Sequence, residues 1–358
     1  MPESPDGAPL LRDPASKAHH IDACLSPEVE YTKTTGFEAW DFENQALPEC
    51  SLNDIDLSMS LCGKSLAAPL MIAPMTGGIE RAHEINRRLA RAAERFGIPM
   101  GVGSQRVAVE NADRVPWFEV RKDAPTTLIF ANFGVGQLAK GWGEKEALRA
   151  VEMIGADALF LHMNPIQEAA QGGDVDFRGL TERIRALCGV MSGHGIPVFA
   201  REVGFGISAR AAEQLIAAGV AGIDCAGAGG TSWAKVEGIC AKTERRRKMG
   251  LRFGEWGIPT AEAIRQVRSV STRIPLIATG GLRNGVDLAK ALALGADVGA
   301  MARPMLVAAH TSEDALHAFI DDVLVELRIC MFGIGAGSLD ALKGTQTLRR
   351  VGVAPSSV

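Results

Sequence analysis

A short polar stretch contains the residue types that could bind a cation and handle a proton. Four such residues follow the apolar run that begins at Ala158: His162, Asn164, Gln167 and Glu168. Imidazole and amide groups serve in proton transfer and orientation, and a carboxylate oxygen is the hard ligand that Mg²⁺ prefers. We therefore interpret His162 and Gln167 as candidate catalytic residues and Glu168 as a candidate Mg²⁺ ligand. A histidine at the end of a strand is also common as a hydrogen-bonded core residue, so that alternative stays open.

Glycine-rich loops form a second group of candidates. Gly280 and Gly281 follow one apolar run, and a glycine-rich loop after another run ends at Thr231. Glycine lets backbone N–H groups approach phosphate oxygens, and the N-terminus of a following helix adds its dipole. Thr231 adds a hydroxyl donor. We expect these loops to hold a phosphate, although such glycines can also serve only to close tight turns.

The cysteine and histidine spacings argue against transition-metal chemistry. The seven cysteines are scattered without a C-x-x-C pair, and the chain has no H-x-H or H-E-x-x-H motif. Zinc sites are built on such spacings. An odd, scattered set of cysteines is typical of a reducing compartment, so we expect a cytoplasmic protein.

These residues need a frame that gathers strand ends, and the apolar pattern predicts one. Eight short apolar runs alternate with helical patterns: 70–74, 100–102, 127–132, 158–164, 197–202, 222–226, 275–279 and 298–302. Most are continuous, as in parallel strands buried on both faces. They predict an α/β fold, a (β/α)8 TIM barrel with an N-terminal extension, whose site lies at the C-terminal ends of the strands. A doubly wound sheet is the alternative, but residues 76–79 lack its G-x-G-x-x-G fingerprint.

The chain divides into four predicted parts. Four prolines within residues 1–15 disfavour regular structure, so we expect a disordered N-terminus there. Residues 16–69 are expected to form an extension that contributes to the active site, 70–351 the barrel, and 352–358 a C-terminal tail. Within the barrel, residues 232–256 interrupt the rhythm with a basic run, which we interpret as a solvated surface rather than an anion site.

The amino-acid composition limits the kinds of partner that the protein is expected to bind. Lys and Arg number 38 against 42 Asp and Glu, which gives a net charge of −4, whereas nucleic-acid binding needs a basic footprint. With 47% hydrophobic and 22% charged residues, global disorder is excluded. The apolar runs are too short to span a bilayer, and the N-terminal residues lack the apolar core of a signal peptide. We expect a small-molecule enzyme without a nucleic-acid or membrane partner.

Combined, these motifs resemble one family, the type 2 isopentenyl-diphosphate Δ-isomerases, which depend on FMN. The resemblance runs from Ser16 to about Val351. The segments that carry it are 17–25, 73–78, 102–106, 131–134, 162–168, 202–208, 229–233 and 280–302. The Gln-Glu pair after H-x-N and the segment G-G-L-R-N-G are specific in combination, whereas G-G-T alone recurs in other FMN barrels.

The resemblance implies an activity and a set of cofactors. It implies a barrel that binds FMN at its mouth and interconverts isopentenyl and dimethylallyl diphosphates, as in isoprenoid biosynthesis, by a 1,3-allylic proton shift. FMN must be reduced, with NAD(P)H as the reductant, and Mg²⁺ holds the diphosphate. Family members are commonly tetramers or octamers, so a homotetramer or homooctamer is expected.

The resemblance also assigns residues by position. The cofactor-binding set is Pro74, Met75, Thr76, Ser104, Asn132, Arg201, Thr231, Gly280, Gly281, Arg283, Ala302 and Arg303. The set that faces the substrate is Lys17, His20, Ser104, Gln105, Arg106, His162, Asn164 and Gln167. Glu168 would bind Mg²⁺.

Two residues depart from the family pattern. Ser16 stands where the family has Arg, and Arg201 stands where it has Lys. An FMN-dependent 2-hydroxy-acid oxidoreductase is a rival reading, but it needs a histidine in the loop 226–233, which has none. A non-catalytic flavin-binding relative is the other alternative.

Overall fold

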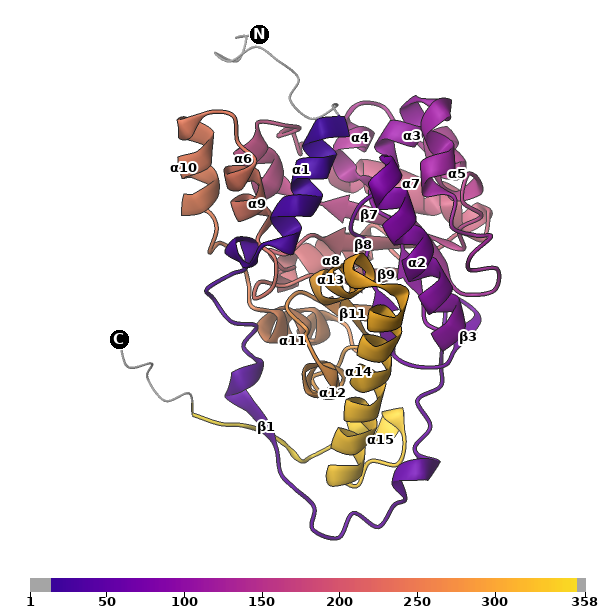
Figure 1. The fold of residues 1–358 in the computed structure, drawn as a ribbon, viewed down its shortest axis with the longest axis vertical. Helices are drawn as coiled ribbons and strands as arrows, with labels where there is room; N and C mark the ends of the chain where they lie inside the picture. Colours follow the sequence, from indigo (N-terminus) through magenta and orange to yellow (C-terminus); the bar gives the residue numbers. More distant parts are fainter. Residues whose placement is uncertain (1–13, 353–358) are drawn as a thin grey trace.

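Eight short strands close into one parallel barrel, in a computed structural model that describes residues 14–352 (Figure 1). Their bounds are β4 Leu70–Ile72, β5 Met100–Gly101, β6 Ile129–Gly134, β7 Ala158–Met163, β8 Val198–Glu202, β9 Gly222–Asp224, β10 Leu276–Thr279 and β11 Val298–Met301. Seven of the eight predicted runs contain their strand, whereas β6 extends two residues past the run 127–132. Strand β11 pairs with β4 to complete the ring. The predicted TIM barrel is therefore confirmed. Most runs extend past their strand at the C-terminal end, because those residues leave the ladder to form loops.

Helices surround the barrel. Those that follow strands or complete the outer layer are α2 Glu80–Phe96, α3 Arg106–Glu110, α4 Val135–Ala139, α5 Glu144–Glu152, α6 Pro165–Gln171, α7 Leu180–Gly193, α8 Ala209–Ala217, α9 Trp233–Ile239, α10 Glu244–Arg252, α11 Thr260–Val270, α12 Gly285–Ala293, α13 Arg303–Thr311, α14 Glu313–Gly333 and α15 Leu339–Lys343. Local sequence sets their ends. The Ser208 side chain caps α8, Asn284 caps α12, and Gly97 in the left-handed region ends α2.

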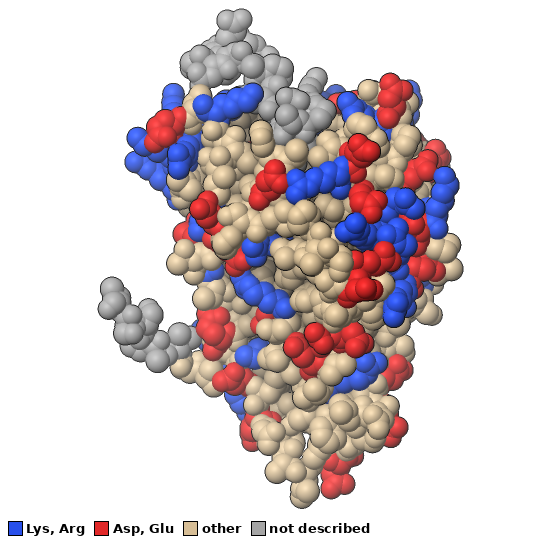
Figure 2. All heavy atoms as spheres, in the orientation of Figure 1, with Lys and Arg blue, Asp and Glu red and all other residues tan. Residues whose placement is uncertain are grey.

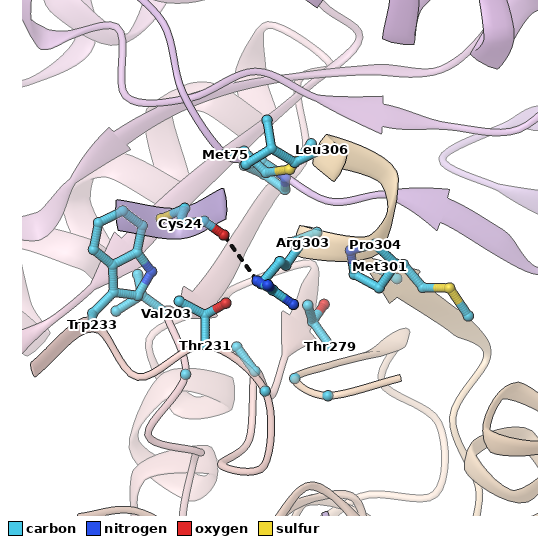
Figure 3. A pocket seen from close by; sticks show the side chains of 18 of the residues that line it. Cys24, Met75, Val203, Thr231, Trp233, Thr279, Met301, Arg303, Pro304 and Leu306 are labelled. Atoms are coloured by element: carbon cyan, nitrogen blue, oxygen red, sulfur yellow. Dashed lines mark hydrogen bonds between the residues drawn. The ribbon is translucent and has the colours of Figure 1, made fainter. Parts of the chain in front are cut away.

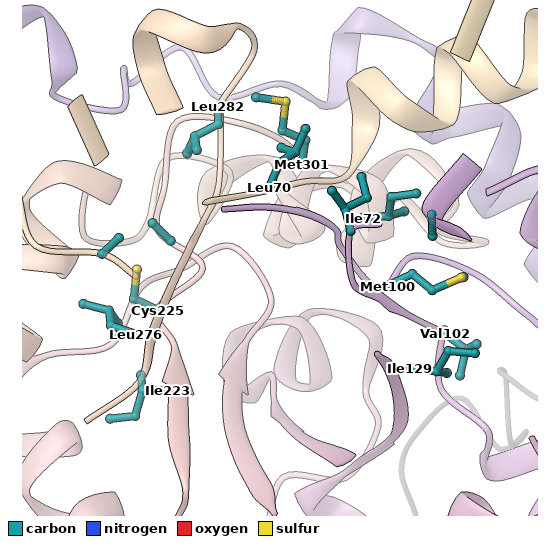
Figure 4. Packing of buried hydrophobic residues seen from close by; sticks show 14 of the residues in the cluster. Leu70, Ile72, Met100, Val102, Ile129, Ile223, Cys225, Leu276, Leu282 and Met301 are labelled. Carbon is teal, nitrogen blue, oxygen red and sulfur yellow. The ribbon is translucent and has the colours of Figure 1, made fainter. Parts of the chain in front are cut away.

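The strands are buried on both faces. Inside the barrel, Phe130 stacks on Phe160 with ring centroids 4.3 Å apart, and Phe199 meets both rings edge-on. Outside it, side chains such as Ile72 and Leu276 pack under the helices (Figure 4). This double burial explains why the runs read as continuously apolar.

An N-terminal extension wraps the barrel. Helix α1 Pro14–Leu25 lies beside α9 and α13 at the C-terminal mouth (Figure 1). The chain then passes the short 3₁₀ turns Pro27–Val29, Phe37–Ala39 and Leu52–Asp54. Strand β1 Trp40–Phe42 pairs with β12 Leu348–Arg350 near the C-terminus. The hairpin of β2 Met59–Leu61 and β3 Lys64–Leu66 buries Leu61 and Leu66 against the barrel interior.

The predicted ends of the chain fall mostly outside the structure. Of residues 1–15, only Pro14 and Ala15 lie among the described residues, and both belong to α1. Of the predicted tail 352–358, only Gly352 is described. No helix in the described range 14–352 is both long and apolar enough to cross a membrane.

The segment that interrupts the barrel rhythm forms α9 and α10. Helix α10 carries most of the basic run, and Arg245, Arg247 and Lys248 are exposed on it. Figure 2 shows the resulting group of basic side chains at the upper left of the molecule. The sequence predicted a solvated surface here, and the exposed side chains form one on α10, whereas Arg246 is half-buried.

Candidate active site

Two adjoining hollows open at the C-terminal mouth of the barrel. The first compartment reaches from Pro74 past the loops after β9 and β10 to Arg303. The second compartment reaches from Ser104 to Glu168 and Asp174. Seven residues line both: His20, Pro74, Met75, Ser104, Arg201, Val203 and Trp233. A molecule bound in the first compartment would therefore lie next to a molecule bound in the second, along this shared border.

Glycines shape the floor of the first compartment. Gly280 and Gly281 have φ of +108° and +78°, which side chains rarely adopt. A Cβ on Gly280 would overlap the carbonyl of Gly227, and a Cβ on Gly281 would overlap Gly229. The loops after β9 and β10 therefore pack backbone against backbone, and only glycine permits it.

An unpartnered hydroxyl faces the same compartment. Thr279, at the end of β10, is 5% exposed, and its Oγ1 has no hydrogen-bond partner among the described residues. Figure 3 shows it beside Thr231 and Arg303 in the pocket wall. A buried hydroxyl without a partner costs free energy, so a bound polar group would stabilise it. Together with the glycine cradle and the N-terminus of α13, this donor set fits the phosphate and ribityl groups of FMN.

Two arginines that line the first compartment share one carboxylate. Arg283 Nη2 lies 2.7 Å from Glu30 Oε2, and Arg303 Nη1 is paired with Glu30 Oε1. Arg303 Nε also donates to the carbonyl of Cys24 at 2.9 Å (Figure 3). Glu30 belongs to the N-terminal extension and was missed from the sequence, because nothing near it in the chain marks it as a partner of residues so distant in sequence.

A fixed positive charge stands at the border between the compartments. Arg201 ends β8, is 5% exposed, and forms an ion pair with Asp224 of β9, which is fully buried. Its guanidinium lies 5.6 Å from the Phe160 ring centroid. Burial lowers the pKa of Arg201 to about 10, so the group stays protonated at neutral pH. Asp224 was also missed, since a continuous apolar run gave no reason to expect a partner carboxylate.

The residue after Arg201 shapes the adjoining loop. The Glu202 carboxylate accepts the N–H groups of Val203, Gly204 and Phe205 at 2.6, 2.8 and 2.5 Å. Burial raises the pKa of Glu202 to about 7 despite these bonds. The Tyr31 hydroxyl donates to the Gly204 carbonyl at 2.9 Å. This loop, which carries Val203 into both compartments, is thereby fastened to the N-terminal extension.

His162 is held as a neutral imidazole in the second compartment. Its Nδ1 lies 2.7 Å from Asn132 Oδ1, while Asn132 Nδ2 donates to the Val102 carbonyl at 3.0 Å. Because that amide oxygen is the acceptor, Nδ1 carries the hydrogen and Nε2 remains an acceptor. Burial, with the charges of Arg201 and Arg106, lowers the pKa of His162 to about 3. It is therefore suited to accept a hydrogen bond rather than to donate a proton.

Helix α6 presents the amide and carboxylate side chains. Asn164 Nδ2 donates to Gln167 Oε1 at 3.1 Å and to Glu168 Oε1 at 2.9 Å. The other Glu168 oxygen accepts the N–H of Asp174 at 2.7 Å. No group of three or more His, Cys, Asp or Glu that could hold a metal occurs in residues 14–352. The carboxylates of Glu168 and Asp174 both line this compartment. Mg²⁺ prefers one or two carboxylates together with water and substrate phosphates, so the side chains present fit this cation.

A second carboxylate lies behind Gln167. Gln167 Nε2 donates to Glu237 Oε1 at 2.8 Å. Glu237 belongs to α9, is 7% exposed, and its Oε2 lies 3.6 Å from His20 Nε2 of α1. The His20 ring meets Trp233 edge-on at 6.0 Å. The sequence interpretation missed Glu237, although a carboxylate one helical turn after Trp233 was a usable signal.

The remaining predicted residues are placed as follows. Thr76, Thr231, Gly280, Gly281, Arg283, Ala302 and Arg303 line the first compartment only, and Arg106, Asn132, His162, Asn164, Gln167 and Glu168 the second only. Asn132, assigned to the cofactor, thus lies on the other side of the border. Lys17 belongs to α1.

The structure corrects the prediction that Gln105 faces the substrate. It is fully buried and lines neither compartment. Its Oε1 accepts the N–H of Asn132 at 2.8 Å, and its Nε2 donates to the Ala150 carbonyl at 2.7 Å. Both ends of the amide are thus used by the backbone, so Gln105 braces the strand that carries Asn132 and does not face a substrate.

The fold and site match a known class of proteins. The sequence profile of the FMN-dependent dehydrogenase family matches residues 14–162 and 190–349. The chain belongs to this family, and its position within the family follows from closer relatives.

These relatives are isopentenyl-diphosphate delta-isomerases. The chain is 51% identical to that of Synechococcus sp. over 338 residues, 94% of this chain and 96% of the relative. It is 50% identical to the Nostoc sp. protein over 94% of this chain and 95% of the relative. For Mycolicibacterium gilvum the identity is 44%, over 93% and 98%. The resemblance seen in the motifs is confirmed.

Solved structures agree on the fold. A lactate oxidase from Pediococcus acidilactici superposes with a TM-score of 0.63 at 18% identity, covering 95% of this chain and 91% of the oxidase. A mandelate oxidase variant gives 0.62 at 18% identity, covering 95% and 97%. At such low identity the likeness concerns the barrel alone.

Proposed function

We propose that this chain interconverts isopentenyl and dimethylallyl diphosphates, using reduced FMN and Mg²⁺. The observation that carries the proposal is the division of the mouth into two joined compartments. One has a glycine cradle, and the other has the neutral His162, the amides of Asn164 and Gln167 and the carboxylates of Glu168 and Asp174. The names of relatives 44–51% identical support the same reaction.

FMN is proposed to occupy the first compartment. Gly280, Gly281 and the start of α13 at Arg303 would hold its phosphate, with Thr279 and Thr231 as hydroxyl partners. Arg201 would lie near its ring system at the shared border. When bound and reduced, the flavin supplies an electron-rich, proton-bearing surface next to the substrate carbons. NAD(P)H is the proposed reductant.

The second compartment is proposed to hold the substrate. Glu168 would bind Mg²⁺ on the diphosphate, with Lys17 and Arg106 as cations and His20 and Ser104 as hydrogen-bond partners. His162 would accept a hydrogen bond at Nε2. The diphosphate contacts would supply binding energy that positions the small apolar part of the substrate between the helices and the flavin.

Gln167 is a proposed catalytic residue. Its amide is fixed at both ends, since Asn164 donates to its oxygen and Glu237 accepts from its nitrogen. Glu237 acts through Gln167 as a positioning residue, because it does not line either compartment. A neutral amide held in one orientation next to a developing cation would direct the transferred proton. It would add no charge of its own near that cation.

Anaerobic isomerisation is the direct test. Purified protein with FMN, a reductant and Mg²⁺ should convert isopentenyl diphosphate to its allylic isomer, and omission of the reductant should stop the reaction. Oxidation of a 2-hydroxy acid without added NAD(P)H would favour the oxidoreductase reading instead. The site does not support the oxidoreductase hypothesis, since the described loop 226–233 contains no histidine. Flavin binding without either activity would indicate a non-catalytic relative.

Cellular location and assembly are two further properties proposed for the enzyme. We expect a cytoplasmic homotetramer or homooctamer, as the family resemblance implies, without a nucleic-acid or membrane partner. Size-exclusion chromatography with light scattering would measure the assembly.

A further inference from the structure

One arginine of the basic run differs from its neighbours. Arg245, Arg247 and Lys248 are exposed, whereas Arg246 is half-buried. Its Nη1 donates to the carbonyl of Gln171, the last residue of α6. The guanidinium packs so closely on Gly172 that a Cβ there would lie 2.6 Å from Nη2. Although α10 is mostly exposed, its Arg246 side chain therefore points inward. It contacts the C-terminal end of α6, the helix that carries Gln167 and Glu168.

The turn that follows α6 folds back onto Glu168. The N–H of Gly173 donates to the Glu168 carbonyl at 2.8 Å, and the N–H of Asp174 donates to its carboxylate at 2.7 Å. A Cβ on Gly173 would overlap Glu168 Oε2. Gly172, with φ of +73°, starts this turn. Arg246 is thus separated from the Glu168 carboxylate by one tight turn whose first residues it contacts.

We propose that Arg246 is a positioning residue for the cation site at Glu168, an inference that rests on the proposed Mg²⁺ role of Glu168. By donating to the last carbonyl of α6, Arg246 fixes the turn 172–174 and so the orientation of the carboxylate oxygens. A cation at a helix C-terminus also complements the helix dipole. Partners that orient a metal ligand strongly influence metal affinity.

The same segment holds the other end of α6. Glu237 of α9 accepts from Gln167 near the start of α6, and Arg246 of α10 donates to Gln171 at its end. The insertion of α9 and α10 after strand β9 therefore fixes the short helix α6 at two points. This arrangement gives a role to a basic run that otherwise lies on the surface.

The test compares Arg246→Gln with Arg247→Gln in flavin-loaded protein. Arg247 is the adjacent, exposed cation, so its variant matches the charge change without the contact. Mn²⁺ serves as the probe, titrated by electron paramagnetic resonance in the presence of isopentenyl diphosphate. We expect the Mn²⁺ dissociation constant of Arg246→Gln to rise about ten-fold, with partial recovery in Arg246→Lys and no change in Arg247→Gln. Amide hydrogen exchange at 172–174 should accelerate only in Arg246→Gln.

The outcomes separate the inference from the function it rests on. Flavin content and thermal melting show whether each variant folds. If Arg246→Gln matches Arg247→Gln in both Mn²⁺ affinity and hydrogen exchange, the inference is overturned while the proposed function stands. If wild-type protein isomerises the substrate but binds no Mn²⁺, the metal role of Glu168 and this inference both fail. If wild-type protein binds Mn²⁺ with substrate but shows no isomerisation, the reaction fails and the positioning role is still measured.

Discussion

The two compartments of the mouth are built in different ways. The floor of the first is made by backbone, because the glycine loops after β9 and β10 pack so closely that added side chains would overlap. The second is made by side chains that bond one another across α1, α6 and α9. A backbone cradle suits a constant group such as a cofactor phosphate, whereas a side-chain network can discriminate between substrates.

The difference predicts different responses to substitution. In the glycine loops of the first compartment an added Cβ would overlap neighbouring backbone, so even a glycine-to-alanine substitution should abolish cofactor binding. In the second compartment a removed group should weaken binding or turnover by a graded amount and leave the flavin in place. Substitutions in each compartment test whether flavin binding and substrate binding respond separately.

Gly280→Ala should have the largest effect. The new Cβ would overlap the Gly227 carbonyl at a residue with φ of +108°, so the loop must move and the phosphate cradle is lost. We expect no flavin absorbance after incubation with excess FMN and desalting. Gly189→Ala, in α7 with nothing near its Cβ position, should retain the flavin. Full flavin binding by Gly280→Ala would show that the cradle is not where the cofactor binds.

Glu168→Gln should leave the flavin bound and lower the apparent affinity for Mg²⁺. The amide oxygen can keep the hydrogen bond from Asn164, but the amide NH2 cannot accept the N–H of Asp174, and the negative charge that a hard cation needs is lost. We expect a loss of at least about ten- to hundred-fold in apparent Mg²⁺ affinity, measured by titrating the isomerisation rate. An unchanged titration would remove Glu168 from the metal site.

Gln167→Ala and Glu237→Gln should both lower kcat about ten-fold or more, with flavin affinity unchanged. Because Glu237 acts through Gln167, the double variant should be little worse than Gln167→Ala alone. Kinetics of the four proteins give the coupling directly. Fully additive losses would mean that Glu237 acts on the substrate by another route, and loss of FMN would mean that these residues hold the cofactor.

The same contrast explains what the sequence could reveal. Strand runs, Gly280, Gly281 and Glu168 are recognisable because the signal lies within a few adjacent residues. Glu30, Asp224 and Glu237 become functional only through contacts with residues far away in the chain, which one sequence does not display.

Gln105 shows the reverse error. Its place beside Ser104 and Arg106 suggested a residue that faces the site, because all three follow the same strand. Its side chain instead turns inward to the Asn132 N–H and the Ala150 carbonyl. Motif position gives the neighbourhood of a side chain, but the direction in which it points depends on backbone groups that need a donor or acceptor.

The neutral state of His162 should appear in the stability of the protein. Its folded-state pKa of about 3 lies below the unfolded value of about 6.5. The unfolded chain therefore binds more protons between these values, so stability is full above about pH 6.5 and falls as the pH drops toward 3. Between pH 7 and 5 the loss is roughly 2 kcal/mol. His162→Gln should lose correspondingly less stability over the same pH range in urea unfolding.

Ser16→Arg should have the smallest and most specific effect, confined to the second compartment. The resemblance places an arginine at this position, four residues before His20 in α1. Each charge-assisted hydrogen bond from it to the diphosphate would contribute roughly 1.5–3 kcal/mol, and about 1.4 kcal/mol is a factor of ten. We therefore expect KM for isopentenyl diphosphate to fall about ten-fold at saturating Mg²⁺. Because the added contact is uniform across ground and transition states, kcat should change little, and FMN affinity should not change. A KM that stays constant or rises would mean that another cation already fills this role or that the diphosphate lies elsewhere, and the family assignment of α1 to the substrate would then have to be withdrawn.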